Sequence, residues 1–277
     1  MRELKLEEIQ QASLAILDEI DRICAKQHLT YYLAYGTLIG AVRHHGFIPW
    51  DDDLDIMMPR ADYEKLRRYF KKKYEGKLKL CTRADTDRYI YGIYRVVDPS
   101  YVFENTNEYE LGYDGGAFID IYPLDAFGGE GQEEEKRAAK VFWKINAMNQ
   151  VYGSWMKPGA KTKIWRKPVK YLCWLYVKLF KGGKKYCRRI DRDFRDIIEE
   201  EFSPDDAYVG VVAWDDRVVR YRREWFEETA RLPFAGREFS VPADWDDVLK
   251  TYYGDYMALP PEKDRHPQHD YRLYAKD

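Results

Sequence analysis

The stretch YGTLIGAVRHHGFIPWDDDLDI, residues 35–56, decides the fold of this chain. A β-type run at residues 31–35 leads into Gly36-Thr37, and the residues after it have the pattern of a helix. The glycine therefore lies at a strand-to-helix turn. An apolar segment then ends in four acidic residues within five positions: Asp51, Asp52, Asp53 and Asp55. Packing alone gives no reason for such a cluster.

The acidic residues form a site for a divalent cation if their backbone is extended. Strand alternation would then place Asp51, Asp53 and Asp55 on one face, while Leu54 and Ile56 enter the core from the other. Carboxylates on one face repel each other unless a cation holds them. Mg²⁺, or Mn²⁺ in its place, binds one or two carboxylates together with substrate phosphate oxygens. The alternative is a solvated acidic turn, which is the usual role of such a run.

The Gly36-Thr37 turn supplies a second part of this site. A glycine there lets backbone N–H groups and the positive end of the helix approach an anion, and the Thr37 hydroxyl is a further donor. A phosphate cradle beside a carboxylate pair is typical of phosphoryl and nucleotidyl transferases. A third acid is expected in FIDIYPLD, residues 118–125, where Asp120 stands in an alternating apolar pattern. An edge-strand aspartate without a catalytic role is the alternative for this position.

Helices and strands alternate through the first half of the chain. The periodicity of apolar residues predicts helices near residues 9–28 and 61–74, and strands within residues 53–58, 89–97 and 117–122. This order predicts an α/β or α+β core with a mixed sheet flanked by helices.

The charge pattern divides the chain of 277 residues into three parts. We expect a catalytic core at residues 1–135, a helical basic insertion at 136–200, and a C-terminal part at 201–277 that completes the core and the active site. Residues 137–190 contain Lys and Arg but no Asp or Glu. A mostly apolar helix between Pro168 and Gly182-Gly183 is either buried, with lysines that reach to solvent, or lies on an anionic membrane surface.

Bulk composition excludes several classes of protein. A formal net charge of -2 argues against a protein that coats nucleic acid, because sequence-independent phosphate binding needs a basic excess. The N-terminal residues carry scattered acids without a long apolar run, which predicts no signal peptide. Four widely spaced cysteines indicate reduced thiols, and no apolar run is long enough to span a membrane. We expect a cytoplasmic protein, either free or peripheral at the inner face of the membrane.

The sequence also resembles a known family. YYLAYGTLIGAVRHHGFIPWDDDLDIMMPRADYEKL, residues 31–66, closely resembles the signature of the LicD family, the phosphocholine transferases that decorate bacterial surface polymers and are related to the fukutin-type sugar-phosphate transferases. YRVVDP at residues 94–99, FIDIYPLD at 118–125 and YYGDYMALPPEKDRHPQH at 252–269 are also similar to that family.

This resemblance implies a nucleotidyltransferase-like fold and a specific reaction. Asp53 and Asp55 would be metal ligands, Asp120 the third acid, and Gly36 and Thr37 would lie at the phosphates. The implied reaction transfers phosphocholine from CDP-choline to a hydroxyl of teichoic acid, lipopolysaccharide or a lipid-linked glycan precursor, and releases CMP. Either Asp120 or Asp51 would accept the proton of the acceptor hydroxyl.

Substrate contacts outside the acidic cluster are expected from cationic and aromatic residues. The candidates for phosphate binding are Arg43, His44, Arg95, Arg265, His266 and His269. A quaternary ammonium cannot donate hydrogen bonds and is held by ring faces, so choline requires an aromatic cage. The expected cage residues are Trp50, Tyr122 and Trp225.

Three alternatives to this function are consistent with the same residues. A nucleotidyltransferase would move a nucleoside monophosphate on the same metal face and release pyrophosphate instead of CMP. The transferred group could also be phosphoethanolamine or ribitol phosphate. A binding protein that has kept the fold without catalysis is a further alternative, against which the intact acids argue.

Overall fold

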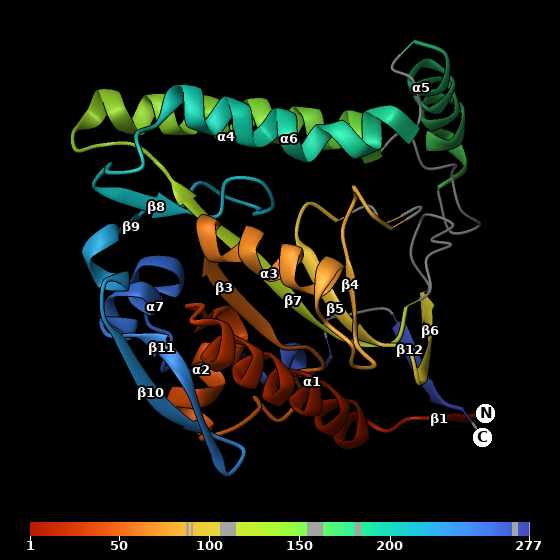
Figure 1. Ribbon diagram of the computed structural model, residues 1–277, viewed down its shortest axis with the longest axis vertical. Coiled ribbons are helices and arrows are strands. Elements are labelled where there is room, and N and C mark those ends of the chain that lie inside the picture. Colours follow the sequence, from red (N-terminus) through yellow and green to blue (C-terminus); the bar gives the residue numbers. More distant parts are fainter. Residues whose placement is uncertain are drawn as a thin grey trace.

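The strand that follows the acidic residues lies inside a mixed sheet at the centre of the molecule (Figure 1). The computed structural model describes residues 1–86, 89, 91–105, 115–153, 163–180, 184–267 and 271–276. Strands of this sheet follow the order β2-β3-β7-β5-β4, and the last residues of β7 pair with β8, which pairs with β9. The bounds are β2 (Tyr32–Leu33), β3 (Asp55–Pro59), β4 (Lys79–Cys81), β5 (Tyr94–Asp98), β7 (Ala117–Ala126), β8 (Tyr208–Gly210) and β9 (Tyr221–Arg222).

The register of three neighbouring strands aligns three charged residues. β3 runs parallel to β7 and pairs Asp55 with Asp120. β5 runs antiparallel to β7 and pairs Arg95 with the same Asp120. Residues directly opposite each other on adjacent strands point to the same face of a sheet. The sheet therefore presents two acids and one arginine side by side, from segments that are far apart in the sequence.

Helices on the sheet form where the apolar periodicity predicts them. α1 (Leu6–Gln27) buries one face against the sheet and ends at His28, which adopts a left-handed conformation with a φ of 51°. α2 (Tyr35–His44) follows β2 and carries Gly36-Thr37 in its first turn, and α3 (Arg60–Lys72) buries Tyr63 and Leu66. The predicted α/β architecture is confirmed.

A second layer of helices covers one end of the sheet. α4 (Gln132–Gly153) lies beside α6 (Lys184–Glu201) in Figure 1, and the two share an apolar cluster with residues that follow β7 and β8. The buried members of this cluster include Phe127, Phe142, Ile190, Phe194 and Val212. The expected boundary at 135/136 falls within α4, so that helix starts before the part of the chain expected to be an insertion.

α5 (Lys167–Phe180) extends away from the remaining helices at one corner of the molecule (Figure 1). It follows a short 3-10 turn at Ile164–Arg166, and it occupies the position of the helix predicted between Pro168 and Gly182. In the described residues no helix combines the length and the apolar character that crossing a membrane requires.

The remaining elements lie at the edges of the fold. A three-stranded antiparallel sheet joins the two ends of the chain, and a β-hairpin packs on α2 (Figure 1). Near the C-terminus, α7 packs on the same helix. Their bounds are β1 (Arg2–Glu3), β12 (Tyr271–Ala275) and β6 (Tyr101–Asn105) for the sheet, β10 (Thr229–Phe234) and β11 (Arg237–Pro242) for the hairpin, and Trp245–Tyr253 for α7.

Candidate active site

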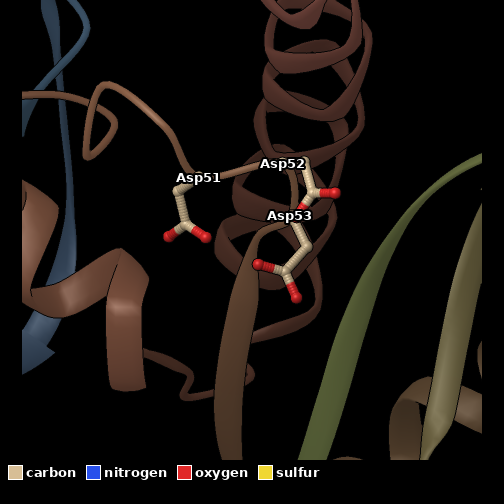
Figure 2. Close-up of side chains that lie close together, drawn as sticks. All are labelled: Asp51, Asp52 and Asp53. Atoms are coloured by element: carbon tan, nitrogen blue, oxygen red, sulfur yellow. The ribbon is translucent and has the colours of Figure 1, made fainter. Parts of the chain in front are cut away.

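Three consecutive aspartates lie on the loop that leads into β3 (Figure 2). Asp51, Asp52 and Asp53 each offer a carboxylate oxygen, and these oxygens lie within 4.8 Å of one another. Two distant elements hold the loop backbone: the Gln10 side chain donates to the Asp51 carbonyl at 2.8 Å, and the Tyr271 hydroxyl donates to the Asp52 carbonyl. The α1 helix and β12 therefore fix a set of like charges that would otherwise separate.

Asp55 begins β3 and carries the most constrained carboxylate of the group. Its side chain is buried, and its Oδ1 has no hydrogen-bond partner among the described residues. Burial raises the pKa of Asp55 well above its ordinary value, and the nearby charges of Asp53, Asp120 and Asp51 raise it further. A buried oxygen without a hydrogen-bond partner costs stability, and a bound cation would offset that cost.

The donor set fits a hard divalent cation. Carboxylate oxygens are the ligands that Mg²⁺ and Mn²⁺ bind, and a cation would satisfy the Asp55 Oδ1 and relieve the repulsion between the acids. Among the described residues, the trio of oxygens within 4.8 Å is Asp51–Asp53, and the expected set of Asp53, Asp55 and Asp120 is not as tightly gathered. The expected ligand set stays a prediction.

Arg95 and Asp120 form a buried ion pair beside this cluster. The Arg95 Nε and Nη2 donate to Oδ1 and Oδ2 of Asp120, both at 2.6 Å. The guanidinium lies 3.7 Å from the ring centroid of Phe118 and 4.4 Å from that of Tyr91. Arg95 was expected at a substrate phosphate, and in this structure it instead holds Asp120 in a fixed orientation. Its role at a phosphate stays a prediction.

Gly36 and Thr37, in the first turn of α2, contact two of the acidic residues. A Cβ on Gly36 would lie 2.8 Å from Oδ2 of Asp51, so a larger residue here would displace this carboxylate from its present position. The buried Thr37 hydroxyl accepts the N–H of Asp55 at 2.8 Å. The expected contact of these two residues with phosphates is untested, and the contacts found here position Asp51 and Asp55.

Two of the other cationic candidates, Arg43 and Arg265, lie near each other. Arg43 donates to the carbonyl of Tyr256 at 2.9 Å, and the positive charge of Arg265 contributes to lowering its pKa, after the larger effect of burial. The Arg265 guanidinium lies 5.7 Å from the Trp50 ring centroid. His266 is exposed and His269 lies outside the described residues. The structure thus brings Arg265 to Trp50, and phosphate binding by this group is a prediction.

A pocket of about 550 Å³ opens beside Asp55. Its walls come from the start of α2, β3, β7, α4, the loop after β8 and α7. The lining residues are Tyr35, Asp55, Tyr122, Trp143, Asn146, Asn149, Trp214, Asp215, Asp216, Tyr252 and Tyr253. Of the expected aromatic cage only Tyr122 lies here, since Trp50 and Trp225 do not line it.

Asp215 is the hydrogen-bonding centre of this pocket. The Tyr35 and Tyr252 hydroxyls donate to its two carboxylate oxygens at 3.2 and 3.1 Å. Burial raises the pKa of Asp215 to about 6 despite these hydrogen bonds. Only a weak signal in the sequence points to this residue: Trp-Asp-Asp recurs at residues 50–52, 214–216 and 245–247, and the third copy merely begins α7.

Comparison with known proteins finds a matching family model and similar individual proteins. Residues 28–125 match a family model described as LicD/FKTN/FKRP, nucleotidyltransferase domain. The chain is 28% identical over 286 aligned residues to the lipopolysaccharide cholinephosphotransferase LicD of Haemophilus influenzae, an alignment that covers 99% of both chains. Residues 28–125 therefore match the nucleotidyltransferase domain of the LicD family, and the whole chain is similar to one cholinephosphotransferase.

Two uncharacterized rickettsial proteins are similar to parts of this chain. The protein of Rickettsia prowazekii is 31% identical over 83 residues, covering 27% of the chain and 31% of the relative. The protein of Rickettsia typhi is 26% identical over 135 residues, covering 41% and 42%. The LicD model covers the acids of β3 and β7 but ends before α4 and Asp215. Most of the pocket wall is therefore contributed by residues beyond the matched domain.

Proposed function

We propose that this chain transfers phosphocholine from CDP-choline to a hydroxyl of lipopolysaccharide or a related surface glycan, including a lipid-linked precursor, and releases CMP. The full-length likeness to a cholinephosphotransferase supports the reaction class. The observation that carries the proposal is the buried Asp55 Oδ1 without a partner, beside further carboxylates and at the wall of a pocket large enough for a small ligand.

Asp53 and Asp55 would hold Mg²⁺ or Mn²⁺, with Asp51 beside them. When bound, the ion neutralises negative charge on the diphosphate of the donor. The protein orients this ligand set through Thr37, which fixes the backbone of Asp55, and through Gly36, which admits the carboxylate of Asp51.

Asp51 is the better of the two candidates for the general base. Both oxygens of Asp120 accept hydrogen bonds from Arg95 at 2.6 Å, so this carboxylate is already engaged in a buried ion pair. Asp51 lies on the loop outside the sheet and is less buried than Asp120. We therefore assign removal of the proton from the acceptor hydroxyl to Asp51, and positioning of the acidic face to the Arg95–Asp120 pair.

The test is a panel of CDP-alcohols with Mg²⁺ and a truncated lipopolysaccharide acceptor, with CMP and pyrophosphate both measured. CMP release that depends on CDP-choline, acceptor and metal is the expected result. Pyrophosphate release from a nucleoside triphosphate would replace this proposal with nucleotidyl transfer. Equal use of CDP-ethanolamine or CDP-ribitol would retain the reaction class and change the transferred group.

We further propose that α5 lies on an anionic membrane surface while the acceptor is modified. The side chains of Val169, Leu172, Tyr176 and Leu179 follow helical spacing along one face, and all are exposed, Leu172 at 67%. The opposite face carries Lys167, Lys170 and Lys178. An exposed apolar face with cations opposite it is the pattern of an interfacial helix. The acid-free composition of residues 137–190 makes the attraction to anionic lipid stronger.

Vesicle co-sedimentation tests this surface. Binding to vesicles that contain anionic phospholipid should fall as the salt concentration rises. Changing Lys167, Lys170 and Lys178 to Gln should weaken the free energy of binding by roughly 1 kcal/mol per cation. Replacing Val169, Leu172 and Leu179 with Ser should abolish binding. The matched control changes Met257 and Leu259, exposed apolar residues elsewhere, to Ser. Equal loss in this control would refute the assignment to α5.

A further inference from the structure

The pocket beside Asp55 has the chemistry of a cation site. Three carboxylates line it, Asp55, Asp215 and Asp216, together with six aromatic side chains and two asparagines. Among the lining residues that the structure describes there is no Lys or Arg. A negatively charged pocket with aromatic walls disfavours phosphate and favours an organic cation.

We propose that this pocket binds the trimethylammonium group of the donor, and thereby selects phosphocholine as the transferred group. The inference rests on the proposed function for the identity of the donor. A trimethylammonium group carries its charge on methyl groups that cannot donate hydrogen bonds. Ring faces and the negative charge of nearby carboxylates therefore bind it, whereas a neutral hydrogen-bond acceptor gains no hydrogen bond from it. The pocket provides both kinds of group.

The position of the pocket agrees with the covalent structure of phosphocholine. Choline places only two carbon atoms between its nitrogen and the phosphate ester oxygen. A site for the ammonium must therefore lie next to the site for the reacting phosphorus. Asp55, the buried acid of the proposed metal site, is itself part of the pocket wall. One small ligand can reach both places.

The aromatic wall is fixed before any ligand binds. Tyr35 adopts a φ of 45°, a left-handed conformation that is rare for a bulky side chain and commonly marks a functional constraint. Its ring packs edge-on against Tyr122 and Tyr252, with centroids 5.0 and 5.1 Å away. Both Tyr35 and Tyr252 donate their hydroxyls to Asp215. Fixed rings lose little conformational entropy on binding, which favours affinity.

The α4 helix holds the other wall in place. The Asn149 side chain donates to the carbonyl of Ala213 at 2.6 Å, and the Asn146 side chain donates to the carbonyl of Asp215 at 3.4 Å. Asn149 also accepts a hydrogen bond from Arg83 at 2.7 Å. Trp143 lies on the same helix and is 58% exposed, so it can close over a ligand. These contacts give the helical layer a role in recognising the donor.

Isothermal titration with phosphocholine, in the presence of Mg²⁺, tests the site without any transfer. The neutral isostere 3,3-dimethylbutyl phosphate has the same shape without the positive charge. We expect the wild type to bind phosphocholine at least tenfold more tightly than the isostere. Trp143→Leu and Asp215→Asn should each weaken phosphocholine binding by roughly twofold to thirtyfold, the range of a cation–π contact, and should leave binding of the isostere less affected.

Trp245→Leu is the matched control, because Trp245 is partly buried but does not line the pocket. Unchanged phosphocholine binding in this variant supports the pocket. Equal affinity of the wild type for phosphocholine and the isostere would overturn the proposal. A loss confined to Trp245→Leu would also overturn it, since the cage would then lie elsewhere.

Failure of this inference can be told apart from failure of the proposed function. If Trp143→Leu and Asp215→Asn release CMP with an unchanged KM for CDP-choline, the transfer reaction stands and the pocket is refuted. If the binding pattern is as expected but no acceptor supports CMP release, the pocket stands and the reaction is refuted.

Discussion

Replacing two aspartates that face each other across one rung of the sheet should change stability in opposite directions. Asp120 and Arg95 are 8% and 6% exposed in their side chains and are joined by two hydrogen bonds of 2.6 Å. Asp120→Asn leaves the buried Arg95 guanidinium without its counter-charge. Removing one partner of a buried ion pair costs about 3 to 5 kcal/mol. For a chain of this size that lowers Tm by about 10 °C.

Asp55→Asn removes a buried charge for which burial and repulsion by the neighbouring acids outweigh the opposite effect of Arg95. Its Oδ1 is buried without a hydrogen bond, and burial and the neighbouring acids raise its pKa well above the ordinary value. The ionised form therefore destabilises the metal-free fold at neutral pH. Loss of this charge should raise the free energy of unfolding in EDTA by on the order of 1 kcal/mol. Both variants should lose CMP release, because both alter the acidic face.

Chemical denaturation in EDTA and in Mg²⁺ measures this pair of effects. Mg²⁺ should stabilise the wild type and not Asp55→Asn. Arg95→Met in the Asp120→Asn background should restore part of the lost stability, since the buried charge is then gone as well. If Asp120→Asn and Asp55→Asn shift the unfolding free energy by the same amount in the same direction, the distinction between a paired and an unpaired carboxylate is wrong.

Three further expectations follow from the site. Gly36→Ala should lower the affinity for Mg²⁺ and the rate of CMP release at least tenfold because its Cβ displaces Asp51, whereas Gly46→Ala, whose Cβ would make an ordinary 3.5 Å contact, should not. Burial raises the folded-state pKa of Asp215 from 3.8 to about 6, so its favourable contribution to folding is complete below pH 4 and is lost as the pH rises to 6. Asp215→Asn should flatten this pH dependence and stabilise the protein at pH 7 by up to about 3 kcal/mol, which denaturant titrations at pH 4 and pH 7 would show. CDP-choline at about a hundred times its Kd should stabilise the protein by about 2.7 kcal/mol with Mg²⁺ and much less in excess EDTA, and equal thermal shifts in both would contradict a metal that bridges donor and protein.

Local pattern in the sequence was enough to predict the first half of the fold. The periodicity of α1, the Gly36-Thr37 pair in the first turn of α2, and the burial of Leu54 and Ile56 around Asp55 are all consequences of neighbouring residues. The expected strands around Asp55 and Asp120 are also present, as β3 and β7. The acidic cluster could be found from sequence for the same reason, because its first members are adjacent in the chain.

Strand register and long-range packing decided the rest, and no local pattern encodes them. The sequence offered Arg95 as a phosphate ligand, and its ion pair with Asp120 became visible only from the pairing of β5 with β7. Trp143, Asp215 and Tyr252 come from three segments that carry no shared motif, and they meet only because α4, the loop after β8 and α7 converge beside β3. Side-chain pairing depends on which strands are neighbours and in which register. That choice is made by the total burial of the folded chain, so the acids could be predicted from sequence, whereas the pocket could be found only in the tertiary structure.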